Sequence, residues 1–249
     1  MDVLKILVCI FIALFLVSLS YVSLYIYIYV GLDCKINFID TLKKTKEFLT
    51  MVSNIRKLYK KEGKVIIFPL IFGNTPGLIN MATSFPKAPV IYKPVWGYHY
   101  AQNPEVFSIA FMHSVGHEIG HWTDIKKGRD FSKRTKEEKE FFCWVREIRN
   151  DFEGINILER HCPNIRRSQI INAIECKANA QVINLKSKKK KCKQNRRKNS
   201  YHDHPDWDFR LQVIKCGQFN QDVIRKIADK SGCTNTDFVL KVIRMYFCK

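Results

Sequence analysis

The order of apolar and polar residues divides the chain into an apolar start and a longer mixed part. Residues 3–32 are almost wholly apolar, and Lys5 is the only charged residue among them. This stretch is longer than the apolar region of a cleavable signal peptide, and it is long enough to cross a bilayer as a helix. The pattern therefore predicts one transmembrane anchor at 3–32, with a buried core helix as the alternative.

Three later segments have apolar residues at helical spacing. The first, 105–125, follows Pro104, a residue favoured at the start of helices. The second, 136–159, keeps Phe141, Trp144, Val145, Ile148 and Phe152 in a helical pattern, and 164–185 continues after Pro163. We expect three helices here.

The stretch before these helices has a different pattern. Residues 37–62 are polar and rich in lysine, which predicts a linker helix within 33–63. Two runs rich in Val and Ile, 64–72 and 88–92, are typical of strands, and the turn residues of 73–77 lie between them. The expected fold class is therefore α+β, mainly helical with a small sheet, behind a single N-terminal transmembrane helix.

Charge and cysteine content indicate a compartment. Four lysines follow the apolar segment within 35–46, whereas Lys5 is the one basic side chain at its start, so the positive-inside rule places the domain in the cytoplasm. The nine cysteines form no CxxC pair and are odd in number, which fits reduced thiols better than a disulfide framework. The expected localisation is membrane, single-pass, with a cytoplasmic domain.

A basic run at 186–198 carries nine of the Lys and Arg residues in 13 positions, within a chain of net charge +19. Three interpretations are open: a solvated loop, contact with anionic lipid, or non-specific nucleic-acid binding. For a tethered protein the lipid interpretation is favoured over nucleic acid, which is an unlikely partner.

The motif that says most about function is His117-Glu118-Ile119-Gly120-His121. On a helix, residues i and i+4 project from one face, so His117 and His121 can both bind one metal ion. Glu118 can then deprotonate a metal-bound water, as in HExxH metallopeptidases. An ordinary helix whose histidines make only local hydrogen bonds is the competing interpretation of so short a pattern.

A catalytic zinc site needs a third protein ligand. The metzincin position, six residues after His121, is Lys127, which excludes that class. Glu147 and Asp151 lie at i and i+4 on the next predicted helix, so Glu147 can bind the metal while Asp151 accepts the outward N–H of a ligating histidine. Weaker candidates for the third ligand are Asp124 and His113, which lie beside the motif, and His161 and Cys162, which lie past the end of the second helix.

With these residues the chain resembles the membrane-associated gluzincins related to the HtpX heat-shock protease and the CAAX-processing prenyl endopeptidases. HExxH followed by Glu147-x-x-x-Asp151 is similar to the family's zinc motifs. The segments 79–83 and 89–92 resemble its Asn-x-x-Ala segment and substrate-binding edge strand, and His204-Pro205-x-x-x-x-Arg210 resembles its His-Pro motif. The resemblance covers about residues 64–215.

The resemblance implies a zincin-like metallopeptidase domain at 64–215, with Zn²⁺ held by His117, His121 and Glu147. It further implies that Glu118 is the general base and that His204 or Arg210 helps to stabilise the oxyanion. The expected function is therefore zinc-dependent cleavage of a peptide or protein substrate.

An alternative of a different class is a catalytically idle, membrane-tethered binding protein. The C-terminal segment 216–249 predicts two helices around a Ser231-Gly232-Cys233 turn, compatible with a helix-turn-helix. Two helices that merely cover the domain are the favoured interpretation of this segment, because it has no evident set of base-reading residues.

Overall fold

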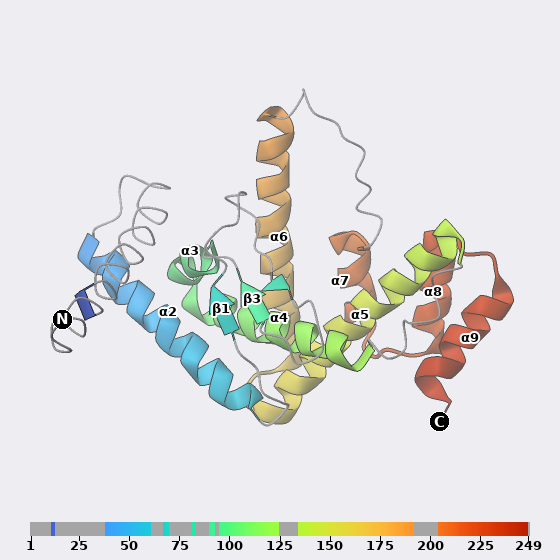
Figure 1. Cartoon of the computed structure of the whole chain (residues 1–249), viewed down its shortest axis with the longest axis horizontal. Helices are drawn as coiled ribbons and strands as arrows, with labels where there is room; N and C mark the ends of the chain where they lie inside the picture. The colour runs from blue at the N-terminus through green and yellow to red at the C-terminus, as the bar shows by residue number, and fades with distance from the viewer. Residues whose placement is uncertain are drawn as a thin grey trace, which may run out of the picture.

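The computed structural model describes residues 11–12, 38–60, 67–69, 81–82, 90–92, 95–124, 134–191 and 204–248. Helices dominate these ranges (Figure 1). The helices are α2 (Phe38–Tyr59), α3 (Val95–Gln102), α4 (Pro104–Asp124), α5 (Lys136–His161), α6 (Arg167–Lys191), α7 (Trp207–Lys215), α8 (Gln221–Ser231) and α9 (Thr236–Phe247).

Strands make only a minor contribution to the described part. They are β1 (Ile67–Pro69), β2 (Met81–Ala82) and β3 (Val90–Tyr92), with β3 in the centre, parallel to β1 and antiparallel to β2. Segments of two or three residues do not form a layer on which helices pack. The expected α+β class is therefore wrong, and the described fold is helical.

The expected single-pass membrane localisation is also contradicted. In the part of the chain that the structure describes, no helix combines the length and apolar character needed to cross a bilayer. Apart from Phe11 and Ile12, residues 3–32, on which that expectation depended, lie outside the described residues.

The three helices predicted around the motif are present with bounds close to those expected. The start of α5 has a clear local cause: Thr135 Oγ1 accepts a hydrogen bond from the Glu138 backbone N–H, and the Glu138 side chain accepts one from the Thr135 N–H. This capping box satisfies two N–H groups that a helix start leaves without partners. Helix α6 runs to Lys191, so residues 186–191 of the basic run are helical, and 192–198 lies outside the described residues.

Helices α4 and α5 approach each other closely at glycines. A Cβ atom on Gly116 would lie 2.8 Å from the Gly154 Cα, and one on Gly154 would lie 2.6 Å from the His113 carbonyl oxygen. Tyr59 of α2 closes the same region, donating from its hydroxyl to the Met112 carbonyl at 2.7 Å. Because the backbones are in contact, polar side chains of α5 reach the motif of α4 directly.

Two apolar cores lie along α5. The first joins α2, β3, α3, α4, α6, the C-terminal half of α5 and part of α7, and it includes Phe48, Trp96 and Ile155. The helix expected as a linker thus contributes to this core. The second joins the N-terminal half of α5 to α7, α8 and α9, and it includes Phe141 and Ile227. Helices α8 and α9 lie at the end of the molecule opposite α2 (Figure 1).

The C-terminal helices correspond to the two predicted there. Asn220 and Asn235 cap their starts through side-chain acceptors, and Gly232 between them has a left-handed φ of 73°. Their apolar faces point into the second core, through Val223, Ile224, Phe238 and Val242 among others. This packing accounts for their amphipathic pattern.

Candidate metal centre

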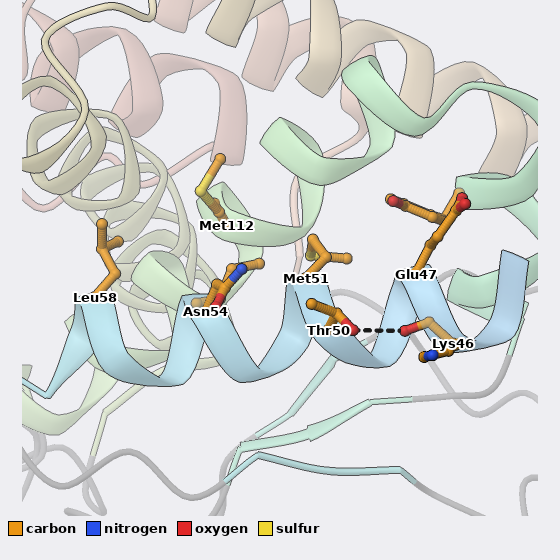
Figure 2. Close-up of a pocket in the computed structure, with 9 residues that line it drawn as sticks. Lys46, Glu47, Thr50, Met51, Asn54, Leu58 and Met112 are labelled. Carbon is orange, nitrogen blue, oxygen red and sulfur yellow. Dashed lines mark hydrogen bonds between the residues drawn. The ribbon is translucent and has the colours of Figure 1, made fainter. Parts of the chain in front are cut away.

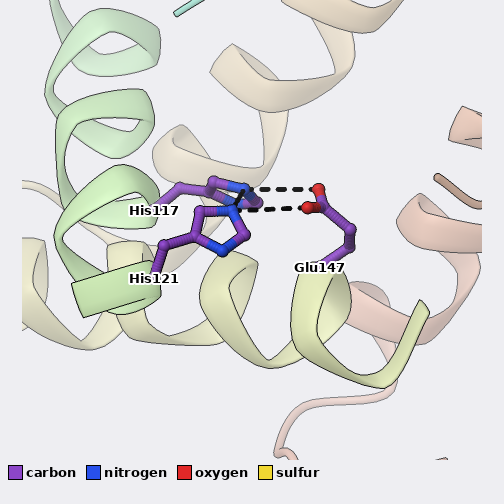
Figure 3. Close-up of side chains that lie close together, drawn as sticks. All are labelled: His117, His121 and Glu147. Carbon is purple, nitrogen blue, oxygen red and sulfur yellow. Dashed lines mark hydrogen bonds and ion pairs between the residues drawn. The ribbon is translucent and has the colours of Figure 1, made fainter. Parts of the chain in front are cut away.

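Helix α4 presents the two motif histidines to one point, and α5 brings a carboxylate to it (Figure 3). The Nε2 atoms of His117 and His121 are 3.2 Å apart. Glu147 places Oε2 3.4 Å from His117 Nε2 and Oε1 3.3 Å from His121 Nε2. The three residues therefore form a group that could hold a metal ion.

The outward nitrogen of each histidine has a partner on α5. His117 Nδ1–H donates to Asp151 Oδ1 at 2.9 Å, and this bond directs Nε2 towards Glu147. His121 Nδ1 lies 2.8 Å from the Asn150 side-chain amide. The amide nitrogen Nδ2 faces the ring, because Asn150 Oδ1 accepts a hydrogen bond from Arg149 Nη1 at 3.1 Å, and this contact holds the His121 ring in place.

The distances between the donor atoms are close to those of a tetrahedral zinc site. In a tetrahedral zinc site with metal–ligand distances of about 2.05 Å, neighbouring ligand atoms are separated by about 3.3 Å. The two Nε2 atoms are 3.2 Å apart, and each lies 3.3 to 3.4 Å from a different oxygen of the Glu147 carboxylate. Two imidazole nitrogens and one carboxylate are also a usual catalytic zinc set. The spacing and the donor types are therefore compatible with a bound metal ion.

Asp151 anchors a second element to the site. Arg210 of α7 donates from Nε to Asp151 Oδ2 at 2.8 Å and from Nη2 to Asp151 Oδ1 at 2.6 Å. Burial raises the pKa of Asp151, but the charge of Arg210 and the bond from His117 outweigh this and hold the pKa well below its usual value. Arg210 thus keeps the Asp151 carboxylate ionised and oriented, and its Nη1 also lies 3.7 Å from Glu147 Oε2.

His204 lies at the open side of the group. Its Nδ1 is 3.0 Å from Glu147 Oε2, while 55% of its side chain is exposed. The hydrogen bond to Glu147 raises the pKa of His204. The exposed imidazole can therefore donate a hydrogen bond to a ligand at the mouth of the site.

Glu118 and Glu147 are both buried but differ in ionisation. Burial raises the pKa of Glu118, which is the direction needed for a general base that works near neutral pH. Burial acts in the same direction on Glu147, but hydrogen bonds from His117, His121 and His204 lower its pKa well below the usual value. The two buried carboxylates therefore differ: the histidines keep Glu147 ionised, whereas the pKa of Glu118 is raised.

Comparison of the chain with known proteins found no related family. No protein-family model, curated protein or solved structure matched the chain. The interpretation of the site therefore depends on its geometry and donor chemistry.

Every residue predicted for the site lies in one cluster. His117, His121 and Glu147 converge, Asp151 contacts His117, and Arg210 and His204 contact these carboxylates. His113, a weaker candidate, is not part of the metal group: its Nε2–H donates to the Asp151 carbonyl at 3.0 Å, and burial lowers its pKa to about 3.

Two residues of the cluster were not predicted. Asn150 approaches His121 through a gap left by Gly120, where a Cβ atom would lie 2.6 Å from Asn150 Oδ1. Lys177 of α6 is buried and donates to Ser114 of α4 at 2.7 Å. Asn150 had a sequence signal, because it lies beside Asp151 on a helix already expected to face the motif. Lys177 had none.

A separate groove of about 650 Å³ lies between α2 and the helices α3 and α4 (Figure 2). Its lining includes Met51 and Leu58 of α2 and Met112 of α4. None of the metal-group residues lines it. The groove is therefore distinct from the candidate metal centre.

Proposed function

We propose that the protein is a zinc-dependent peptidase of the gluzincin type, acting on peptide or protein substrates. The observation that carries the proposal is the convergence of His117 Nε2, His121 Nε2 and the Glu147 carboxylate at 3.2 to 3.4 Å, with Glu118 buried in the same cluster. Zinc is favoured over other metals because the donor set and spacing match a tetrahedral site.

His117, His121 and Glu147 would hold the ion. When bound, it would polarise the scissile carbonyl and make a water more acidic. Glu118 would accept a proton from this water and deliver it to the leaving amine, a role that its raised pKa suits. His204, exposed beside Glu147, can donate a hydrogen bond to the developing oxyanion.

Glu118→Gln tests this proposal, because it removes the proton acceptor and leaves all three proposed ligands. The purified variant should keep one zinc per chain by elemental analysis. Its cleavage of a peptide library, read by mass spectrometry, should fall by about 10²- to 10⁴-fold. Glu105→Gln, on the exposed first turn of α4, is the matched control and should cleave normally.

Two results would contradict the proposal. Unchanged cleavage by Glu118→Gln would remove the proposed base. Absence of zinc from the wild type, combined with salt-sensitive DNA binding, would favour the alternative of a catalytically idle binding protein.

A further inference from the structure

Lys177 lies in the middle of α6, beside the metal group but outside it. Its side chain is buried, with 9% of the residue exposed. The ammonium donates to Ser114 Oγ at 2.7 Å and lies over two indole rings, 5.6 Å from the centroid of Trp96 and 5.3 Å from that of Trp207. The charge is thus enclosed by two aromatic faces and one hydroxyl.

Among the residues that the structure describes, the ammonium of Lys177 has few partners. It carries three N–H donors, and Ser114 Oγ is the one hydrogen-bond acceptor that it has among the described residues. None of the described carboxylates forms an ion pair with it, whereas the equally buried Arg210 has two hydrogen bonds to Asp151. Because burying an incompletely paired charge is costly, this ammonium is suited to bind an anionic group.

The position of Ser114 places this ammonium next to the reacting centre. Ser114 lies three residues before His117 and four before Glu118, so all three share one face of α4. Glu118 and Glu147 are among the charges that act on Lys177. An anion held by Lys177 would therefore lie about one helical turn from the metal group.

The balance of buried charge points to the same kind of ligand. Around the metal group, three carboxylates (Glu118, Glu147 and Asp151) face two buried cations (Lys177 and Arg210). A divalent ion would leave this region with one excess positive charge. Transfer of a proton from water to Glu118 moves charge inside the site without changing the total, so the excess persists until an anion enters.

We propose that Lys177, between Trp96 and Trp207, binds a carboxylate of the peptide substrate close to the scissile bond. This inference rests on the proposed peptidase function and specifies its substrate class. The carboxylate is either the C-terminal one of a peptide or the side chain of an Asp or Glu residue. Lys177 contacts the substrate and determines specificity, while His117, His121 and Glu147 hold the ion.

A binding experiment tests the proposal without catalysis. The zinc-loaded full chain is titrated with 3-phenylpropanoate and with the uncharged 3-phenylpropanamide, and binding is followed by calorimetry. The wild type should bind the carboxylate about tenfold or more tightly than the amide, because a hydrogen-bonded ion pair is lost with the amide. Lys177→Gln should abolish this preference while keeping one zinc per chain.

Three variants complete the design. Lys177→Arg keeps a cation and should restore part of the preference. Lys215→Gln is the matched control, because Lys215 is half-exposed and paired with Glu175. Lys177→Met removes an incompletely paired buried charge, so it should unfold at a higher temperature than the wild type when both are metal-free. If Lys177 only stabilised the fold, Lys177→Met would instead unfold at a lower temperature than the wild type.

The source of the carboxylate is found by cleavage of paired peptides. Preference for free over amidated C-termini identifies the terminal carboxylate, and preference for Glu over Gln in amidated peptides identifies a side chain. The proposal is overturned if the wild type does not prefer the carboxylate probe, or if the preference survives in Lys177→Gln, which would mean direct binding to the ion. A zinc-loaded enzyme that cleaves peptides without such a preference would refute this inference alone.

Discussion

Replacing Asp151 by Asn should weaken both the fold and the metal site. The substitution keeps the shape of the side chain and removes its charge. Asp151 is fully buried and accepts three hydrogen bonds, one from His117 and two from Arg210. An amide has one oxygen and would turn its NH₂ group towards either His117 or Arg210, both of which are donors.

The expected loss follows from the remaining partners of Arg210. Without the Asp151 charge, the nearest carboxylate to Arg210 is Glu147, whose Oε2 is 3.7 Å from Nη1. Removing one member of a buried ion pair costs about 3–5 kcal/mol, because the other charge stays buried. At about 2–4 °C per kcal/mol for a chain of this size, the unfolding temperature of the metal-free protein should fall by about 6–20 °C.

The zinc affinity should fall as well. Asp151 orients His117 and increases its basicity, and loss of such a partner usually lowers metal affinity by about 10- to 100-fold. Calorimetric unfolding of metal-free protein and competition with a zinc chelator measure the two effects separately.

Asp222→Asn is the matched control for Asp151→Asn. Asp222 pairs with Arg225 at 3.0 Å, and the two side chains are 76% and 55% exposed. An exposed pair of this kind contributes about 0–1 kcal/mol, so this variant should unfold like the wild type. In the double variant Asp151→Asn/Arg210→Met, the loss of stability should be smaller than the sum of the single losses. The reasoning is refuted if Asp151→Asn costs less than about 1 kcal/mol, the size of an exposed pair, and leaves zinc affinity unchanged.

Two further predictions concern the packing and the charge of the site. Gly154→Ala should destabilise the protein by about 1–3 kcal/mol in denaturant titration, because the new Cβ atom would lie 2.6 Å from the His113 carbonyl oxygen. Alanine is otherwise favoured over glycine inside helices, so a stabilised variant would show that α4 and α5 do not touch there. The metal-free protein should lose stability as pH rises from 6.5 to about 9, because burial lowers the pKa of His117 but hydrogen bonds to Asp151 and Glu147 raise it to about 9. That contribution is complete below 6.5, the value of an unperturbed histidine, and is lost as pH passes the raised pKa. Thermal unfolding across this range should show the decline, and a flat profile would contradict it.

The helices were the most predictable part of the fold. Residues 105–125 and 136–159 correspond closely to α4 and α5, since both have local signals: Pro104 at one start and the Thr135–Glu138 capping box at the other. The strand positions agree with the prediction wherever the structure describes them. Val and Ile in 64–72 and 88–92 favour extended backbone, and the described residues of these runs, 67–69 and 90–92, pair with each other in the sheet.

The site residues that were predictable from the sequence are those spaced one helical turn apart. His117 and His121 are one turn apart on α4, as are Glu147 and Asp151 on α5, so the helical repeat alone places each pair on one face. Arg210 and His204 were expected only from a resemblance to gluzincins. Their contacts with Asp151 and Glu147 depend on where α7 packs, about 60 residues along the chain from α5.

By itself, the sequence determined which side chains share a helix face, where α5 begins, and that two histidines and a carboxylate are available for a metal. Only the tertiary structure decided that the two faces meet. The contact of Gly116 with Gly154 brings the helix backbones together, and α6 carries Lys177 beside Ser114. The reason is physical: helical periodicity is a local property of the chain, whereas burial of a charge and the distance between two helices depend on packing between distant segments.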